Sequence, residues 1–199
     1  MAVKIGEYTL HTIETGRFGL DGGAMFGIVP KPLWERKIPA DAKNRIPLHM
    51  RCLLIEGAGR LILVDTGLGH KYDEKFATIF NVDHNVATLE GSLQAAGYTH
   101  DDVTDVIITH LHFDHCGGCT QRVGDQLEIV FKNATHHVQL AHWEWAQVPN
   151  VRERNSFLAE NLDPLAASGQ LVFIEGAATL SPGIDVIPVS GHTEAMQLV

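Results

Sequence analysis

The chain has 199 residues, of which 45% are hydrophobic and 20% are charged, a composition that is typical of folded globular proteins and excludes wholesale disorder. Its 24 acidic and 15 basic residues give a net charge of −9 at pH 7, which argues against a nucleic-acid partner. There is no signal-peptide pattern, no apolar run long enough to span a bilayer and only three cysteines, so we expect a cytoplasmic protein with no membrane partner and no disulfide framework.

The N-terminal part of the sequence predicts one strand followed by a long loop. Apolar and polar residues alternate over 3–14, as expected for a strand with one exposed face. Glycine and proline are frequent over 16–47, which predicts a long loop with one helical turn around Trp34, and loops of this length are often functional. Met25, Phe26 and Trp34 could line an apolar substrate pocket or could anchor the loop, and the sequence does not separate these two roles.

The rest of the chain predicts strands and helices in alternation. Strands are expected at 50–56 and 60–65, joined as a hairpin through Gly-Ala-Gly, and at 105–109, 128–131, 135–139, 171–174 and 185–189. Helices are expected at 71–80, 86–96, 140–147 and 151–167, and Pro164 should weaken the end of the last one. This order favours a layered α/β arrangement, and the length suits a single domain over residues 1–199.

The stretch "IITHLHFDHCGG" at 107–118 concentrates metal-binding side chains where a buried strand is expected to end. Residues two apart on a strand point the same way, so His110 and His112 can bind one ion. The turn that follows can direct Asp114 and His115 towards a second ion. Imidazole and carboxylate ligands suit Zn²⁺. Structural zinc sites more often have four cysteine or histidine ligands that close the site, whereas a site made of histidine and aspartate leaves room for water, as a hydrolase needs.

This stretch resembles the signature of the metallo-β-lactamase-fold hydrolases. Two further segments match that family in order and separation: "ILVDTGLG" at 62–69 and "VIPVSGHTEAMQLV" at 186–199. The resemblance covers the chain from about residue 48 onwards. It implies an αβ/βα sandwich that holds one or two Zn²⁺ ions between its halves, with Mn²⁺ or Fe²⁺ as alternative metals.

The resemblance also implies a role for each motif residue. His110, His112 and His192 would bind the first metal, and Asp114 and His115 would bind the second. Asp114 would also help to orient the metal-bound water and so take part in catalysis. We call residues 109–118, which carry these ligands, the metal loop. Supporting hydrogen bonds to this loop would come from Asp65 and, in a similar way, from Thr193.

Family members with two metals normally continue beyond the Gly-His-Thr motif, with a bridging aspartate and a further histidine. This chain ends seven residues after His192, so we expect the second half of the sandwich to be incomplete. We therefore expect the domain to be truncated at its C-terminus, as part of a longer protein or as a shortened gene product. An uncovered sheet would favour association with another copy.

These patterns predict a metal-dependent hydrolase that uses metal-activated water on a small ester, lactone or related acyl substrate. The acidic surface and long N-terminal loop resemble the lactonase-like branch more than the nucleases. Other chemistries of the same fold remain open: thioester hydrolysis, β-lactam hydrolysis, phosphotriester hydrolysis and iron-dependent dioxygenation. A truncated, non-catalytic metal-binding domain is the alternative from another class.

Two other clusters favour a structural interpretation. Cys116 and Cys119 form a single C-x-x-C pair, and we expect both to pack as small apolar side chains. In "ATHHVQLAHWEWAQ", the adjacent His136 and His137 would point to opposite faces of a strand, so we expect a strand and a helix there, with His142 on the helix, and no second metal site.

Overall fold

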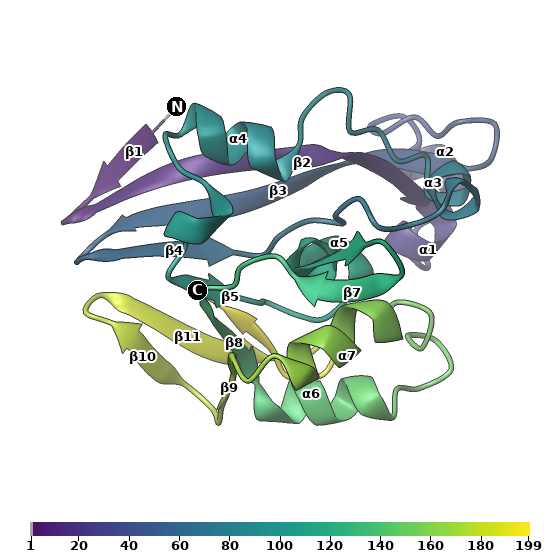
Figure 1. Ribbon diagram of the computed structural model, residues 1–199. Coiled ribbons are helices and arrows are strands. Elements are labelled where there is room, and N and C mark those ends of the chain that lie inside the picture. Colours follow the sequence, from purple (N-terminus) through teal and green to yellow (C-terminus); the bar gives the residue numbers. More distant parts are fainter. Residues whose placement is uncertain (1) are drawn as a thin grey trace.

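A seven-stranded mixed sheet runs through the protein, in the order β1-β2-β3-β4-β5-β8-β9 (Figure 1). The computed structural model describes residues 2–199. Strands β1 to β4 pair antiparallel, whereas β5, β8 and β9 continue the sheet parallel to β4. The strands are β1 (Ala2–Ile5), β2 (Tyr8–Asp21), β3 (Arg45–Gly57), β4 (Arg60–Val64), β5 (Asp105–Ile107), β8 (Thr135–Gln139) and β9 (Leu171–Ile174).

Within residues 2–199, two smaller sheets and seven short α-helices complete the fold. The small sheets are β6 (Thr120–Val123) with β7 (Gln126–Ile129), and β10 (Ala178–Ser181) with β11 (Ile184–Val189) and β12 (Met196–Leu198). The helices described within residues 2–199 are α1 (Gly22–Phe26), α2 (Lys31–Trp34), α3 (Glu74–Phe80), α4 (Leu89–Ala95), α5 (Phe113–Cys116), α6 (Leu140–Gln147) and α7 (Ala159–Ala167). Single 3₁₀ turns lie at His100–Asp102 and Gly117–Cys119.

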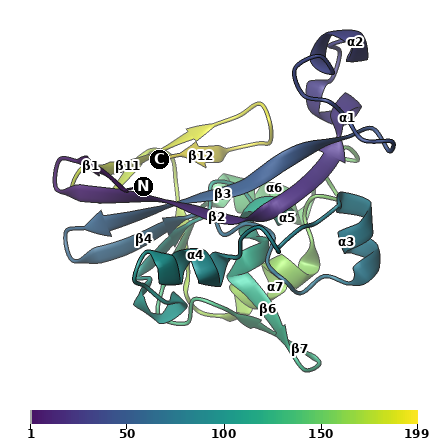
Figure 2. The ribbon, with the colours of Figure 1, turned by 90° about the horizontal axis from the view of Figure 1, so that it is seen from above.

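The large sheet is covered on both faces, and the alternation along β4 shows why. Leu61 and Leu63 pack into the main core, which includes buried residues of α4, α6 and α7. Ile62 and Val64 point to the opposite face and pack against Ile184 of the three-stranded sheet. Figure 2 shows β11 and β12 on one side of the large sheet and α4 and α7 on the other. The expected α/β sandwich is confirmed.

The hairpin expected around Gly-Ala-Gly is confirmed. Gly57 pairs with Arg60, and the two residues between them, Ala58 and Gly59, have φ values of 52° and 72°. A two-residue turn with both central residues at positive φ matches the right-handed twist of the flanking strands. β4, the second strand of this hairpin, ends at Val64, directly before the motif residue Asp65.

The long loop expected over 16–47 is wrong at both of its ends. β2 continues to Asp21 and β3 begins at Arg45, with pairing from Arg17–His49 to Asp21–Arg45. The register of the β2–β3 pairing shifts between Glu14 and Gly16, and glycine suits the φ of 137° at this bulge. Only residues 22–44 therefore form an excursion, and Figure 2 shows its helices α1 and α2 beyond the end of the sheet.

Aromatic stacking anchors this excursion. Trp34, in the helical turn that the sequence predicted, is only 4% exposed, and its ring stacks on Phe26 with centroids 4.9 Å apart. Met25 is 45% exposed by contrast. Phe26 and Trp34 thus hold the segment together through their own contact.

The helix expected over 151–167 is wrong in its first half, because residues 151–157 form turns and α7 begins only at Ala159. Pro164 lies inside α7 and has no N–H for the carbonyl of Glu160. The hydroxyl of Thr120 donates to that carbonyl at 3.0 Å instead. This bond satisfies the free acceptor and ties α7 to β6.

Most of the remaining elements match with small shifts. The segments 135–139, 140–147 and 171–174 are confirmed as β8, α6 and β9. A turn divides the strand expected over 3–14 into β1 and β2, and the strands expected at 105–109, 128–131 and 185–189 are β5, β7 and β11. The helices expected at 71–80 and 86–96 begin later, at Glu74 and Leu89, because the side chains of Asp73 and Thr88 cap their first turns. The sequence did not predict β6, β10 or β12. None of the helices in residues 2–199 is long and apolar enough to cross a membrane.

Candidate metal centre

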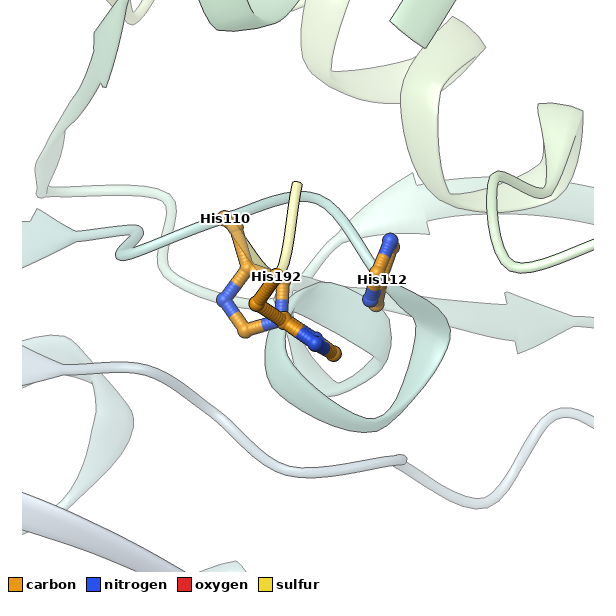
Figure 3. A group of neighbouring side chains, drawn as sticks. All are labelled: His110, His112 and His192. Atoms are coloured by element: carbon orange, nitrogen blue, oxygen red, sulfur yellow. The ribbon is translucent and has the colours of Figure 1, made fainter. Parts of the chain in front are cut away.

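Three histidines converge beyond the end of β5. His110 and His112 lie in the loop between β5 and α5, and His192 lies in the loop between β11 and β12. Each offers a ligand atom, and these atoms all lie within 4.8 Å of one another. Figure 3 shows the three side chains gathered around one point, although His192 is about 80 residues away in the sequence. The structure therefore brings together the three residues expected at the first metal.

The nitrogen atoms of this group suit a metal ion. The Nε2 atoms of His110 and His112 are buried and have no hydrogen-bond partner in the part of the chain that the structure describes. Burial and the neighbouring histidines lower the pKa of His110 strongly and that of His112 to about 3. Both rings are therefore neutral, the state in which imidazole binds a metal. Buried polar atoms normally have partners, so these two nitrogens fit a metal well.

His115 lies beside this group and is held by Asp65. Its Nδ1 is 2.8 Å from Oδ2 of Asp65, and its ring centroid is 3.9 Å from that of His110. Burial opposes a charge on His115, but the hydrogen bond to Asp65 and the charges of Asp65 and Asp114 outweigh it and raise the pKa to about 9. Oδ2 of Asp114 lies 3.5 Å from Nε2 of His115. The two residues expected at a second metal are thus next to the histidine group.

Asp65 itself adopts a left-handed conformation with φ of 59° at the end of β4. Its backbone N–H donates to Ile107 at 2.9 Å, and its carboxylate accepts bonds from the backbone N–H and hydroxyl of Thr109 at 2.8 Å each. Asp65 therefore joins the end of β4 to both ends of the metal loop, through Thr109 and His115.

The two glycines after His115 allow the metal loop to pack closely on the loop after β4. A Cβ atom on Gly117 would lie 2.2 Å from the carbonyl oxygen of Leu68, and one on Gly118 would lie 2.3 Å from that of Thr66. The backbone N–H of Thr66 in turn donates to the carbonyl of His115 at 2.8 Å. A side chain at either glycine would push the metal loop away from Asp65.

The sequence profile of the metallo-beta-lactamase superfamily matches residues 47–196. The chain belongs to this superfamily. The resemblance noted in the three motifs is thus confirmed for the family and for its α/β sandwich fold.

Similar proteins include hydrolases and lactonases. An N-acyl homoserine lactonase of Bacillus cereus is 28% identical over 166 residues, which cover 77% of this chain and 58% of that protein. A probable metallo-hydrolase of Mycobacterium tuberculosis is also 28% identical, over 85% of this chain and 60% of its own length. The chain therefore spans less than two thirds of the length of these curated relatives.

Two solved structures agree with the fold. A probable metal-dependent hydrolase from Staphylococcus aureus has a TM-score of 0.88 and 34% identity, over 98% of this chain and 69% of that one. The dizinc quorum-quenching lactonase AidC, solved with the product N-hexanoyl-L-homoserine, has a TM-score of 0.79 and 24% identity, over 99% of this chain and 68% of that one.

Glu153 is a residue at this superfamily site that sequence reasoning missed. Its Oε2 accepts bonds from the hydroxyl of Thr193 at 2.7 Å and from the indole N–H of Trp145 at 3.0 Å. The same oxygen lies 3.9 Å from Nε2 of His112. Glu153 therefore contacts both segments that carry the histidine group, and Thr193 acts through it. The turn segment that holds Glu153 was expected to be helical and gave no signal for this position.

His142 forms a second connection between the same segments. The backbone N–H of Leu111 donates to its Nε2 at 2.8 Å, so the proton is on Nδ1, which donates to the carbonyl of Glu194 at 2.6 Å. His142 is fully buried and holds the loop of His110 and His112 against the loop of His192. The structural interpretation of this histidine is correct, and its contacts place it directly behind the metal centre.

The side chains of the other sequence clusters are not part of the histidine group. His136 is buried in the core, and His137 bonds to Asp105 at 2.8 Å at the start of β5. Cys116 and Cys119 are free, fully buried and part of the main core. Burial accordingly raises the pKa of both thiols. The expected packing role of the C-x-x-C pair is consistent with this burial.

Proposed function

We propose that the protein is a metal-dependent hydrolase that acts on a small ester, lactone or related acyl compound. The observation that carries this proposal is the histidine group: two neutral, buried imidazoles with unpartnered Nε2 atoms, and a third beside them. The lactonases and metallo-hydrolases among its relatives support the reaction class.

In this proposal, His110, His112 and His192 hold the first zinc ion, and Asp114 and His115 hold a second. Bound zinc would supply a Lewis acid and a water ligand that loses its proton near neutral pH. Asp65 holds a proton on Nδ1 of His115, so a metal would bind at Nε2 and displace the proton there. The carboxylate of Asp114 lies 3.5 Å from Nε2 of His115, the side of the ring that faces away from Asp65, where Asp114 would hold the second ion and help to orient its water ligand.

The histidine group has a buried side and an exposed side. His112 and His110 are almost fully buried, whereas His192 is exposed. A substrate would therefore approach from the side of His192, while the buried wall excludes water from the other side. A preorganised, partly dry site strengthens the interaction between positive groups and a developing oxyanion.

The proposal is tested by turnover with the 199-residue chain loaded with zinc, manganese or iron(II). Substrates should include acyl-homoserine lactones, aryl esters and thioesters, and we expect hydrolysis of at least one acyl class. His110→Ala should abolish it, and the exposed His49→Ala should leave it unchanged. Stoichiometric zinc binding without any turnover would instead favour a non-catalytic metal-binding domain.

A further inference from the structure

A cavity of about 370 Å³ lies behind the metal loop, away from the histidine group. The loop after β4, the first turn of α4 and the β6–β7 hairpin enclose it, and its lining includes Thr66, Lys71, Glu90, Gly118 and Arg122. No metal-site histidine lines this cavity. It is therefore separate from the site proposed for hydrolysis.

Lys71 is the unusual residue of this cavity. It is 9% exposed, and its ammonium group donates to the carbonyl of Gly117 at 2.5 Å and, more weakly, to that of Thr120 at 3.4 Å. Its Nζ also lies 4.7 Å from the centre of the Tyr72 ring. Among residues 2–199, no carboxylate forms a salt bridge with it. Lysine is almost never buried to this extent without an anionic partner.

The other charged groups around the cavity already have partners. Arg122 lies 3.4 Å from Glu160, and His70 lies 3.6 Å from Glu90. Both nitrogens of His84 face backbone carbonyl oxygens. In the part of the chain that the structure describes, Lys71 is therefore the cation of this cavity without a salt-bridge partner, and it carries a single positive charge. A monoanion balances it, whereas a dianion would be repelled by Glu90 on the same wall.

The remaining walls are apolar in part. Leu89, which is 5% exposed, and Val130 both line the cavity. Burial lowers the pKa of Lys71 to about 8, although the charge of Glu160, which forms no salt bridge with Lys71, opposes this shift. A bound anion with a short hydrocarbon tail would satisfy the charge and the apolar wall together.

We propose that this cavity is a binding site for a small monocarboxylate, held by the ammonium group of Lys71, with its alkyl chain against Leu89 and Val130. The site is independent of the proposed hydrolysis. It touches the metal loop, however, because Lys71 also holds the carbonyl of Gly117, two residues after His115. Occupation of the cavity would fix the loop that carries the metal ligands.

The test is a two-dimensional ¹H–¹⁵N NMR titration of the metal-free chain with acetate and butanoate, repeated with the zinc-loaded chain. Butanamide, sodium chloride and inorganic phosphate are the comparison solutes. We expect saturable shifts at the amides of Gly69, Gly118 and Gly124, with butanoate binding more tightly than acetate, and no saturation by the amide or by phosphate. Lys71→Met should weaken butanoate binding at least tenfold, while the exposed Lys75→Met should leave it unchanged.

A second measurement needs no variant. The ¹³Cε resonance of Lys71 reports its titration, and its midpoint should move upward when butanoate is present and stay in place with butanamide. No saturable shift in the wild-type chain, equal binding by the amide, or a fixed Lys71 midpoint would each overturn the proposal. Because binding is measured without substrate, failure of the hydrolase proposal would not affect this result.

Discussion

Replacing Asp65 by asparagine tests how the structure controls the proton of His115. Nδ1 of His115 now faces a carboxylate oxygen at 2.8 Å, so Nδ1 carries the proton and Nε2 can bind a metal. Thr109 also donates to Asp65, through its N–H and its hydroxyl. In Asp65→Asn, the amide oxygen would keep the bonds from Thr109, and the amide N–H would face His115. That N–H needs an acceptor, so the proton of His115 would move to Nε2.

Two opposing effects follow, and pH separates them. In the wild type, the pKa of His115 is about 9, so at pH 7 a metal must displace a proton at a cost of about a hundredfold in affinity. The asparagine variant lacks the carboxylate that raises this pKa and escapes that cost. It instead has the wrong tautomer, and loss of such a supporting partner weakens metal binding by roughly 10- to 100-fold. The two effects nearly cancel at pH 7, and the tautomer effect is fully visible only near pH 9.

The assay is competition for zinc against a chromophoric chelator at pH 7 and pH 9. We expect similar affinities for wild type and Asp65→Asn at pH 7, and an affinity roughly 10- to 100-fold lower for the variant at pH 9. Asp73→Asn is a matched control, because Asp73 is an exposed carboxylate that caps α3 away from the site. An affinity ratio between Asp65→Asn and wild type that stays constant over this pH range would refute the tautomer argument.

Three further outcomes can be measured on the same chain. Glu153→Gln keeps an oxygen that accepts the hydrogen bond from Thr193 but removes the negative charge near His112. We therefore expect zinc affinity to fall about tenfold with little change in stability, and unchanged affinity in the chelator assay would contradict this. Gly118→Ala places a Cβ atom 2.3 Å from the carbonyl oxygen of Thr66. Urea denaturation should show that the free energy of unfolding falls by about 3 kcal/mol, whereas a decrease below about 0.5 kcal/mol would show that the loop adapts. The pKa of His112 is about 3 when folded and about 6.5 when unfolded, so the unfolded chain binds more protons below pH 6.5. His112 alone accounts for about 2 kcal/mol less stability at pH 5 than at pH 7, and the strongly lowered pKa of His110 adds to this loss. Denaturation of the metal-free chain should therefore show a loss of at least about 2 kcal/mol, and equal stability at the two pH values would contradict neutral, buried histidines.

The local part of the site could be predicted from the sequence because the spacing of its residues along the chain indicates which side chains lie together. His110 and His112 are two residues apart directly after a short buried strand, and this spacing predicted that their side chains would lie together. The strand ends at Ile107, however, and long-range contacts from Asp65 and His142 hold the loop that carries the two histidines. The hairpin before Asp65 was equally accessible, because Gly-Ala-Gly between two apolar runs specifies a turn. In both cases, a few neighbouring residues were enough for the prediction.

Other features depended on contacts that no local pattern shows. The pairing of residues 17–21 with 45–49 closes an excursion of more than twenty residues, and the glycines and prolines there suggested a loop. β2 continues beyond a shift in register between Glu14 and Gly16, which the sequence does not reveal. The start of α7 was hidden in the same way, because the polar run before it has helical composition but turns back towards the metal centre.

The position of His192 shows how these long-range contacts build the site. His192 is exposed, so its own packing does not fix it. Its neighbours do: Thr193 donates to Glu153, and the carbonyl of Glu194 accepts from His142. Further along, the backbone N–H of Gln197 donates to Thr109 at 2.9 Å. These contacts fix the backbone on the C-terminal side of His192 while its ring stays free to reach solvent. The backbone at His192, the proposed third ligand, is thus preorganised by Thr193, Glu194 and Gln197, which would reduce the entropy lost if an ion binds.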